Sequence, residues 1–275
     1  MDPLQRLQEA IQAQNIGAFL VTNLPSVQWL TGFTGSYGVA LVTPDQAVML
    51  TDSRYTVAAA EQVKNMEVRT FGSPKTAVDF MFENLQALGV TELVFDEEQV
   101  TVGTLKSWKS RWEGVELQPG TDPIATLRLI KAEHEVQAIR EACLLADACL
   151  GHIVTLLRSG VTENELQLEV ELFFRRHDSI VSFPVIVVSG ERSARPHGVP
   201  SDKPLEKGDF VTFDLGCRVR GYASDITRTF VIGKASERQK EIYEQVLKAE
   251  VSAIEALRPG VNGKDVDRLA RTILN

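Results

Sequence analysis

The chain has 275 residues, 44% of them apolar and 24% charged, a composition typical of a globular protein with one large or two ordinary domains. Its net charge of −8 comes with scattered Lys and Arg, which disfavours a nucleic-acid-binding surface, and no apolar run is long enough to span a membrane. The sparse cysteines lack metal-binding spacing, and the N-terminus has no secretory pattern, so we expect a cytoplasmic protein with structural thiols at Cys143, Cys149 and Cys217.

The first half of the chain alternates helices with strands, which predicts a layered α/β domain. Residues 29–36 are punctuated by glycine and are expected to form a loop. Residues 119–123 are rich in turn formers and predict a boundary between domains 1–123 and 124–275. Helices are expected at about 3–15, 53–64, 76–88 and 100–111, and strands at about 18–22, 39–42, 47–51, 68–71 and 92–95.

The second half is expected to open with a long helix, over about residues 130–157, that stops at Gly160. Thr162 and Glu165 have the spacing of a capping box, which predicts a second helix to about residue 176. An apolar strand at 183–189, a loop that carries His197, two strands that form a hairpin, and helices at about 236–257 and from about 264 follow.

The predicted hairpin contains two aspartates. Val211, Phe213 and Leu215 alternate with polar residues, which is typical of a strand with one buried face. If the loop is centred between residues 219 and 220, Leu215 faces residue 224 and Asp214 lies directly opposite Asp225. The two carboxylates would then repel each other at a Cβ separation of about 5 Å.

Such a pair is tolerable if one carboxylate is protonated or if cations lie between them. Hard divalent cations prefer oxygen ligands, and paired carboxylates are a feature of hydrolytic sites with two metal ions. The alternatives are that both side chains are solvated, or that the strands pair in another register.

His197 is the third candidate residue, because a histidine on a neighbouring loop can stabilise a developing oxyanion. Alone, a histidine between Pro196 and Gly198 can equally be an ordinary surface residue. The other histidines are expected to be solvated or to lie at helix ends, and they are His134, His152 and His177.

Three segments, in this order, resemble the Xaa-Pro peptidase family of proline dipeptidases and aminopeptidases P. They are Arg-Pro-His-Gly-Val-Pro-Ser at 195–201, Leu-Glu-Lys-Gly-Asp-Phe-Val-Thr-Phe-Asp-Leu-Gly at 205–216 and Gly-Tyr-Ala-Ser-Asp-Ile-Thr-Arg-Thr-Phe-Val-Ile-Gly at 221–233. Residues 29–36 and 50–56 resemble the creatinase-type N-terminal domain, which methionyl aminopeptidases lack. The resemblance implies an α/β (α+β) chain with a creatinase-like N-terminal domain and a pita-bread-type catalytic domain, whose antiparallel sheet has flanking helices.

The resemblance also implies roles for the three candidate residues. Asp214 and Asp225 match the first two ligands of a dinuclear Mn²⁺ or Co²⁺ centre, and His197 matches a histidine that contacts substrate and helps to stabilise the tetrahedral intermediate. The implied substrate is a peptide with proline at its second position. A homodimer is implied as well.

The family continues beyond the last predicted helix into a segment that supplies a His ligand and two Glu ligands, and no residue here matches them. We therefore expect an incomplete catalytic domain, weak metal binding and poor or absent hydrolysis from these 275 residues. One alternative is a non-catalytic relative that serves binding or dimer assembly. Another is metal-free C–N hydrolysis of the creatinase type, which the Asp214 and Asp225 pair disfavours.

Overall fold

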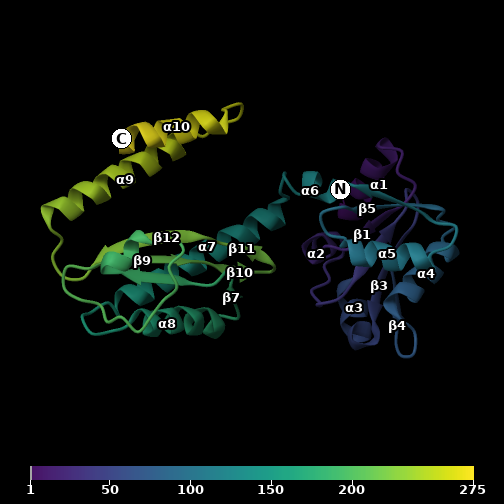
Figure 1. The fold of residues 1–275 in the computed structure, drawn as a ribbon, viewed down its shortest axis with the longest axis horizontal. Helices are drawn as coiled ribbons and strands as arrows, with labels where there is room; N and C mark the ends of the chain where they lie inside the picture. Colours follow the sequence, from purple (N-terminus) through teal and green to yellow (C-terminus); the bar gives the residue numbers. More distant parts are fainter. Residues whose placement is uncertain (1) are drawn as a thin grey trace. The chain divides into compact units, whose positions relative to one another are not determined.

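The computed structural model describes residues 2–275, which form two compact units that divide between Ala132 and Glu133 (Figure 1). This division lies beyond the predicted boundary at residues 119–123. That stretch contains the end of one strand and the start of a short helix, and both belong to the first unit.

A six-stranded mixed sheet forms the centre of the first unit, in the order β4-β3-β2-β1-β5-β6. The strands β1, β2 and β3 pair antiparallel, whereas β4, β5 and β6 join the sheet in parallel. The sequence predicted all of them except β6, an edge strand that contains Pro119, and proline is tolerated mainly at sheet edges. Their bounds are β1 (Phe19–Val21), β2 (Val39–Val42), β3 (Ala47–Asp52), β4 (Glu67–Phe71), β5 (Glu92–Asp96) and β6 (Glu116–Gly120).

Helices cover this sheet, and side chains alternate between two buried clusters. In β1, Phe19 and Val21 join one cluster with residues of α1, while Leu20 joins the other with Trp108 of α5. Both faces of the sheet are therefore buried, as the α/β prediction requires. The helical elements are α1 (Pro3–Ala13), α2 (Leu24–Thr31), η1 (Ser53–Tyr55), α3 (Thr56–Gln62), α4 (Ala77–Ala87), α5 (Val102–Arg111) and α6 (Pro123–Leu127).

The predicted loop at residues 29–36 was wrong at its start, because Trp29 lies in α2. This helix has Pro25 in its first turn, where the backbone N–H that proline lacks would have no partner within the helix. The helix ends at Gly32, which has a φ of 78°. The glycine that indicated a loop is therefore the C-cap of a short helix.

The second unit contains two three-stranded sheets, in the orders β11-β10-β7 and β12-β9-β8. The capping box that the sequence predicts at the start of α8 is confirmed, with Thr162 and Glu165 each accepting from the other's backbone amide. The helical elements are α7 (Glu133–Val154), α8 (Glu163–Arg176), η2 (Gly190–Ala194), α9 (Glu237–Ala256) and α10 (Gly263–Leu274). The strands are β7 (Ile180–Val181), β8 (Ile186–Ser189), β9 (Phe210–Leu215), β10 (Cys217–Val219), β11 (Tyr222–Ala223) and β12 (Ile226–Val231).

The buried core of this unit lies between its strands and the helices α7 and α8. Val211, Phe213 and Leu215 of β9 are all buried, whereas the intervening Thr212 and Asp214 are partly exposed. The alternation predicted for this strand is confirmed. It leaves the side chain of Asp214 on the sheet face that points away from the α7–α8 core.

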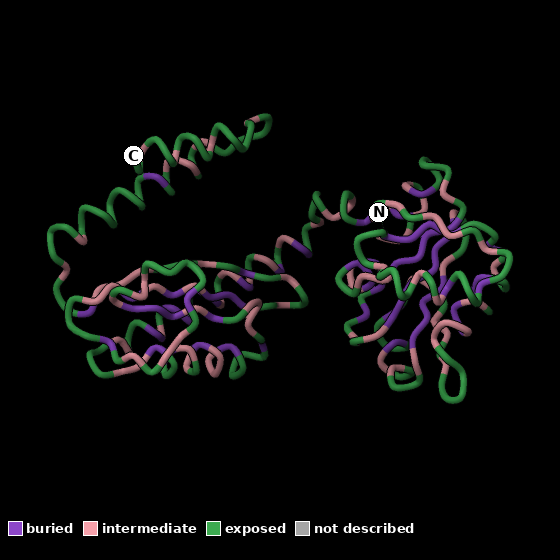
Figure 2. Tube along the Cα trace, in the orientation of Figure 1, coloured by how far each residue is buried: buried purple, intermediate pink, exposed green. Residues whose placement is uncertain are grey.

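The helices α9 and α10 pack against each other but are mostly exposed (Figure 2). Ala249 is the single buried residue of α9, and α10 has none among its described residues. None of the described helices combines the length and the apolarity needed to cross a lipid bilayer.

Candidate metal site on the β9–β12 hairpin

The hairpin forms as predicted, but the predicted register was wrong. Asp214 pairs with Thr227, and Leu215 pairs with Ile226. Asp225 is therefore not directly opposite Asp214. Because it lies two residues from Thr227, it occupies the diagonal position on the same face of the sheet.

The conformation of the turn explains the shifted register. Val219 pairs with Tyr222, so the loop consists of Arg220 and Gly221. Both have positive φ values, 49° and 87°, as a two-residue type I′ turn requires. The loop centre therefore lies one residue later than the sequence analysis placed it, which moves each partner by two positions.

A glycine at the junction of the two sheets brings three strands close together. Gly216 lies between β9 and β10, and its carbonyl accepts from the amide of Ser182 at 3.0 Å. A Cβ atom at this position would lie 1.9 Å from the carbonyl oxygen of Ser224 and 2.5 Å from the Ser182 hydroxyl. Only glycine permits this approach, which sets the backbone directly before Asp225.

Asp214 presents an oxygen atom that the fold leaves without a partner. Its Oδ1 is buried and has no hydrogen-bond donor among the described residues. A buried acceptor without a donor costs free energy, on the order of 1–3 kcal/mol. With the exposed carboxylate of Asp225 beside it, this oxygen fits the hard donor set that divalent cations prefer.

The electrostatics of the pair agree with that interpretation. Burial raises the pKa of Asp214 above its ordinary value, a hydrogen bond with Thr227 opposes the shift, and the neighbouring Asp225 raises the pKa further. The imidazole of His197 acts in the opposite direction and lowers the pKa of Asp214. Ionised Asp214 is thus less favourable in this pocket than in water, and a nearby cation would offset that difference.

In the protein without added metal ions, we expect Asp214→Asn to raise the melting temperature near neutral pH. Because folding raises the pKa of Asp214, its stabilising contribution is complete below the ordinary pKa of 3.8 and is lost as the pH rises through the folded-state pKa. Asparagine never ionises and avoids that loss. Thermal unfolding between about pH 3 and pH 8 checks this, since the two proteins should converge in acid. A variant less stable than the wild type at neutral pH would contradict it.

A groove of about 940 Å³ is lined by Asp225 of this pair and lies between the strands β9 and β12 and the helix α9. Its strand side is mainly polar and includes Asp225, Thr227 and Thr229. Its helix side is mainly apolar and includes Ile242 and Val246. The groove can therefore take a ligand with a polar backbone and an apolar side chain.

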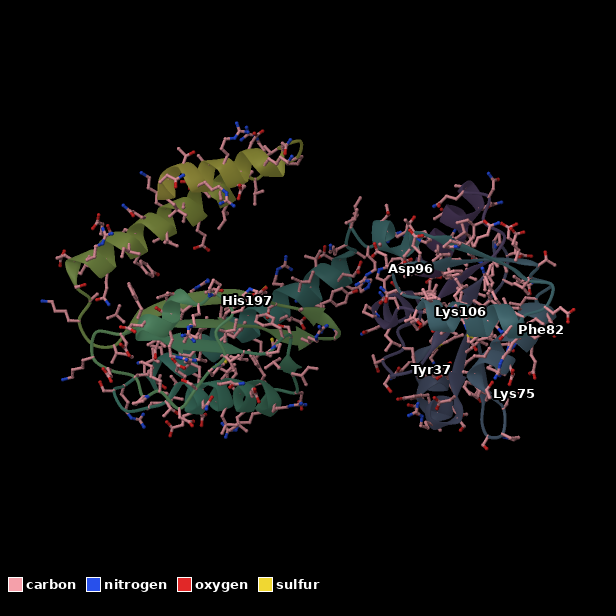
Figure 3. The ribbon with its side chains drawn as sticks, viewed as in Figure 1. Tyr37, Lys75, Phe82, Asp96, Lys106 and His197 are labelled. Carbon is pink, nitrogen blue, oxygen red and sulfur yellow. The ribbon has the colours of Figure 1, made fainter. Side chains whose placement is uncertain are left out.

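The loop after η2 carries His197 (Figure 3), whose side chain is exposed. It lies close enough to Asp214 to act on its pKa, so the structure brings all three predicted residues into one region. Among residues 2–275, no group of three or more His, Cys, Asp and Glu side chains is placed to hold a metal ion. The two aspartates supply only part of the near-octahedral shell of such an ion.

Sequence reasoning missed other residues of this region. Glu163 was seen only as part of a helix start, yet its carboxylate is fully buried and bonds to the loop that carries His197. The sequence offers one signal for Glu163, which is a charged residue next to a capping box that Thr162 and Glu165 already complete.

Both units match known family models. Residues 3–130 match the Creatinase/Prolidase N-terminal domain, and residues 137–275 match Metallopeptidase family M24. These matches confirm the α/β fold class, the creatinase-like N-terminal domain and the resemblance identified in the sequence.

Relatives and solved structures agree with the family models. An uncharacterised peptidase of Bacillus subtilis is 37% identical over 98% of this chain and 76% of its own length, and a Pyrococcus horikoshii Xaa-Pro dipeptidase is 33% identical over 99% and 76%. The structure of a Bacillus anthracis Xaa-Pro dipeptidase superposes with a TM-score of 0.93 at 36% identity, over 99% of this chain and 76% of that one. A Thermotoga maritima X-Pro aminopeptidase gives a TM-score of 0.89 at 31% identity, over 97% and 77%. The chain therefore belongs to metallopeptidase family M24, a family of hydrolases, and carries a creatinase/prolidase N-terminal domain.

Proposed function

We propose that this chain is a metal-dependent peptidase that hydrolyses the Xaa-Pro bond at the N-terminus of dipeptides or short peptides. The observation that carries the proposal is the unpartnered, buried Oδ1 of Asp214 beside the carboxylate of Asp225, at the edge of an open groove. Relatives with the printed names Xaa-Pro dipeptidase and X-Pro aminopeptidase support the specificity for proline.

Asp214 and Asp225 would hold divalent cations, two in the proposed centre, with Mn²⁺ or Co²⁺ as the favoured ions. A bound cation supplies a Lewis acid that activates water for attack on the scissile carbonyl carbon. Asp214 provides the unpartnered buried oxygen, whereas the exposed Asp225 provides an oxygen that faces the groove. Because two carboxylates fill few coordination positions, we expect the affinity of these 275 residues for metal to be weak.

His197 would bind the substrate and donate a hydrogen bond to the oxyanion that forms on the attacked carbonyl. Its exposed imidazole is free to contact a ligand, and it lies within electrostatic reach of Asp214. A donor aimed at the oxyanion lowers the barrier because the negative charge on that oxygen grows in the transition state. A substrate proline, whose ring is apolar, would be received by the mainly apolar helix side of the groove.

His197→Ala is expected to lower kcat for Ala-Pro hydrolysis in the presence of Mn²⁺ by about 100-fold, the usual cost of removing one oxyanion donor. The matched control is His134→Ala, which removes an exposed imidazole from α7 and should leave kcat unchanged. Release of free proline measures the rate. Equal rates with and without a chelator, or equal cleavage of Ala-Gly and Ala-Pro, would overturn the proposed function.

A second candidate function is a non-catalytic role in binding or assembly. The observation that favours it is that only two acidic ligands come together among residues 2–275. A chain of this kind would bind proline-containing peptides without cleaving them. Isothermal titration calorimetry with Ala-Pro measures binding, and analysis of the peptide recovered from the calorimeter shows whether it has been cleaved. Cleaved peptide indicates the peptidase, and bound but intact peptide indicates the non-catalytic role.

We further propose a homodimer and a cytoplasmic location. The family resemblance supports the dimer, and three free cysteines support a reducing compartment. Sedimentation of the purified protein tests the first, and cell fractionation tests the second.

A further inference from the structure

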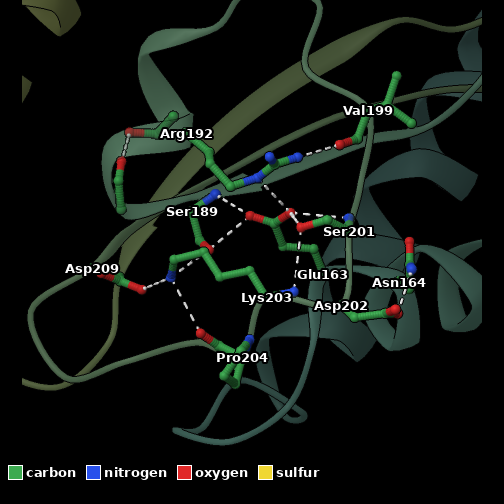
Figure 4. Close-up of polar contacts among 12 residues, drawn as sticks. Glu163, Asn164, Ser189, Arg192, Val199, Ser201, Asp202, Lys203, Pro204 and Asp209 are labelled. Atoms are coloured by element: carbon green, nitrogen blue, oxygen red, sulfur yellow. Dashed lines mark hydrogen bonds and ion pairs between the residues drawn. The ribbon is translucent and has the colours of Figure 1, made fainter.

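A single buried carboxylate binds the chain on both sides of His197, in and beside the loop between β8 and β9 (Figure 4). Glu163 is the first residue of α8 and has an exposed fraction of 0%. Its Oε1 accepts from the amide and the hydroxyl of Ser189, at 2.7 and 2.8 Å, where β8 ends and the loop begins. Its Oε2 accepts from the amide and the hydroxyl of Ser201, at 3.1 and 2.8 Å, just after His197.

An arginine within the loop completes this clamp. Arg192 donates from Nε to Oε2 of Glu163 at 3.1 Å and from its terminal nitrogen to the carbonyl of Val199 at 2.5 Å. The guanidinium therefore joins the carboxylate to the part of the loop directly after His197. Because a charge-assisted bond is stronger than a neutral one, this link restrains the loop from inside.

The first turn of α8 binds the same loop through its backbone. The amides of Glu163 and Asn164 donate to the carbonyls of Lys203 and Ser201, at 3.2 and 3.0 Å. These amides have no partner within the helix, so the loop satisfies groups that a helix start leaves free. The Nζ of Lys203 also reaches Asp209 and the hydroxyl of Ser189, at 2.6 and 3.1 Å, which ties the loop to the start of β9.

Helix stability does not account for this carboxylate. The α8 cap is already complete, because Thr162 and Glu165 satisfy each other's amides. Burying a carboxylate costs several kcal/mol unless donors surround it, and every donor to Glu163 lies at or within the loop between β8 and β9. The main effect of burying this carboxylate is therefore to order the loop between β8 and β9.

We propose that Glu163 is a positioning residue, which fixes the loop so that the imidazole of His197 faces the Asp214 and Asp225 pair. This inference rests on the proposed function only in so far as it gives His197 a role in catalysis. The order of the loop itself is independent of that role.

Glu163→Gln tests the proposal with an isosteric change. One carboxylate oxygen becomes an NH₂ group, which then faces the backbone amide of Ser189 or that of Ser201, and two donors cannot bond to each other. We expect amide exchange in residues 190–203 to become at least about tenfold faster. The imidazole signal of His197 should shift and sharpen, while those of His134, His152 and His177 stay unchanged.

Glu165→Gln is the matched control, because it makes the same change two residues away, at the exposed capping box. It should leave loop exchange and the His197 signal as in the wild type. Ser201→Ala removes a hydroxyl that donates to Glu163 and accepts from the Lys203 amide, but it keeps the backbone bond from residue 201 to Glu163. It should therefore give the same changes to a smaller degree in a protein that folds normally. This milder variant covers the case in which Glu163→Gln fails to fold.

In hydrolysis of Ala-Pro, Glu163→Gln should lower kcat while leaving the Mn²⁺ affinity of Asp214 and Asp225 unchanged. Unchanged loop exchange and an unchanged His197 signal in both Glu163→Gln and Ser201→Ala would overturn the positioning role. The exchange and imidazole measurements need neither metal nor turnover, so they test the positioning role separately from the proposed function.

Discussion

Asp225→Asn is expected to abolish Mn²⁺-dependent hydrolysis of Ala-Pro and to weaken Mn²⁺ binding by more than about 100-fold. Even residues that only support a metal ligand cost about 10- to 100-fold in affinity when they are replaced, and a direct ligand should cost more. Asparagine keeps the shape of the side chain and one neutral oxygen but removes the negative charge that attracts the cation. Titration of Mn²⁺ followed by electron paramagnetic resonance measures the affinity, and proline release measures turnover.

The loss should come without loss of the fold. Asp225 raises the pKa of Asp214, so the two ionised carboxylates repel each other when no cation is present, and removing one charge relieves that repulsion. Asp147→Asn on an exposed position of α7 makes the same charge change away from the site and should leave both readouts unchanged. Wild-type Mn²⁺ affinity in Asp225→Asn would exclude this residue as a ligand.

The parts of the site that the sequence predicts are those that depend on local periodicity. The alternation of Val211, Phe213 and Leu215 places Asp214 on the sheet face away from the α7–α8 core, and the structure confirms it. Thr162 and Glu165 likewise fix the start of α8 through contacts within one helical turn. Period-2 and capping patterns are local, so a single sequence is sufficient to find them.

The parts that the sequence could not give depend on backbone conformation or on distant contacts. The register of Asp225 follows from positive φ at Arg220, a non-glycine residue for which that conformation is uncommon. The clamp of Glu163 joins residues that lie 26 and 38 positions away along the chain. No local pattern encodes such a separation, and the buried charge becomes visible only in the folded chain.

Gly216→Ala is expected to destabilise the protein by about 3 kcal/mol, because overpacking against rigid backbone costs 1–3 kcal/mol and at times more. The added methyl group would lie 1.9 Å from the carbonyl oxygen of Ser224, so the strand that leads into Asp225 must move. That oxygen also accepts from the Ser182 hydroxyl at 2.8 Å, which holds it in place. Denaturant unfolding measures the stability, and Mn²⁺ titration of the folded variant should show weakened binding, since Asp214 and Asp225 separate.

Gly151→Ala adds the same methyl group but is expected to stabilise the protein. Gly151 lies within α7, and a Cβ atom there would meet nothing within 4 Å. Alanine should therefore stabilise the helix by about 0.5–1 kcal/mol through its higher helix propensity. The two variants together separate the general effect of a methyl group from the close contact at the sheet junction. If Gly216→Ala were as stable as the wild type and bound Mn²⁺ equally well, the junction would not set the spacing of the two aspartates.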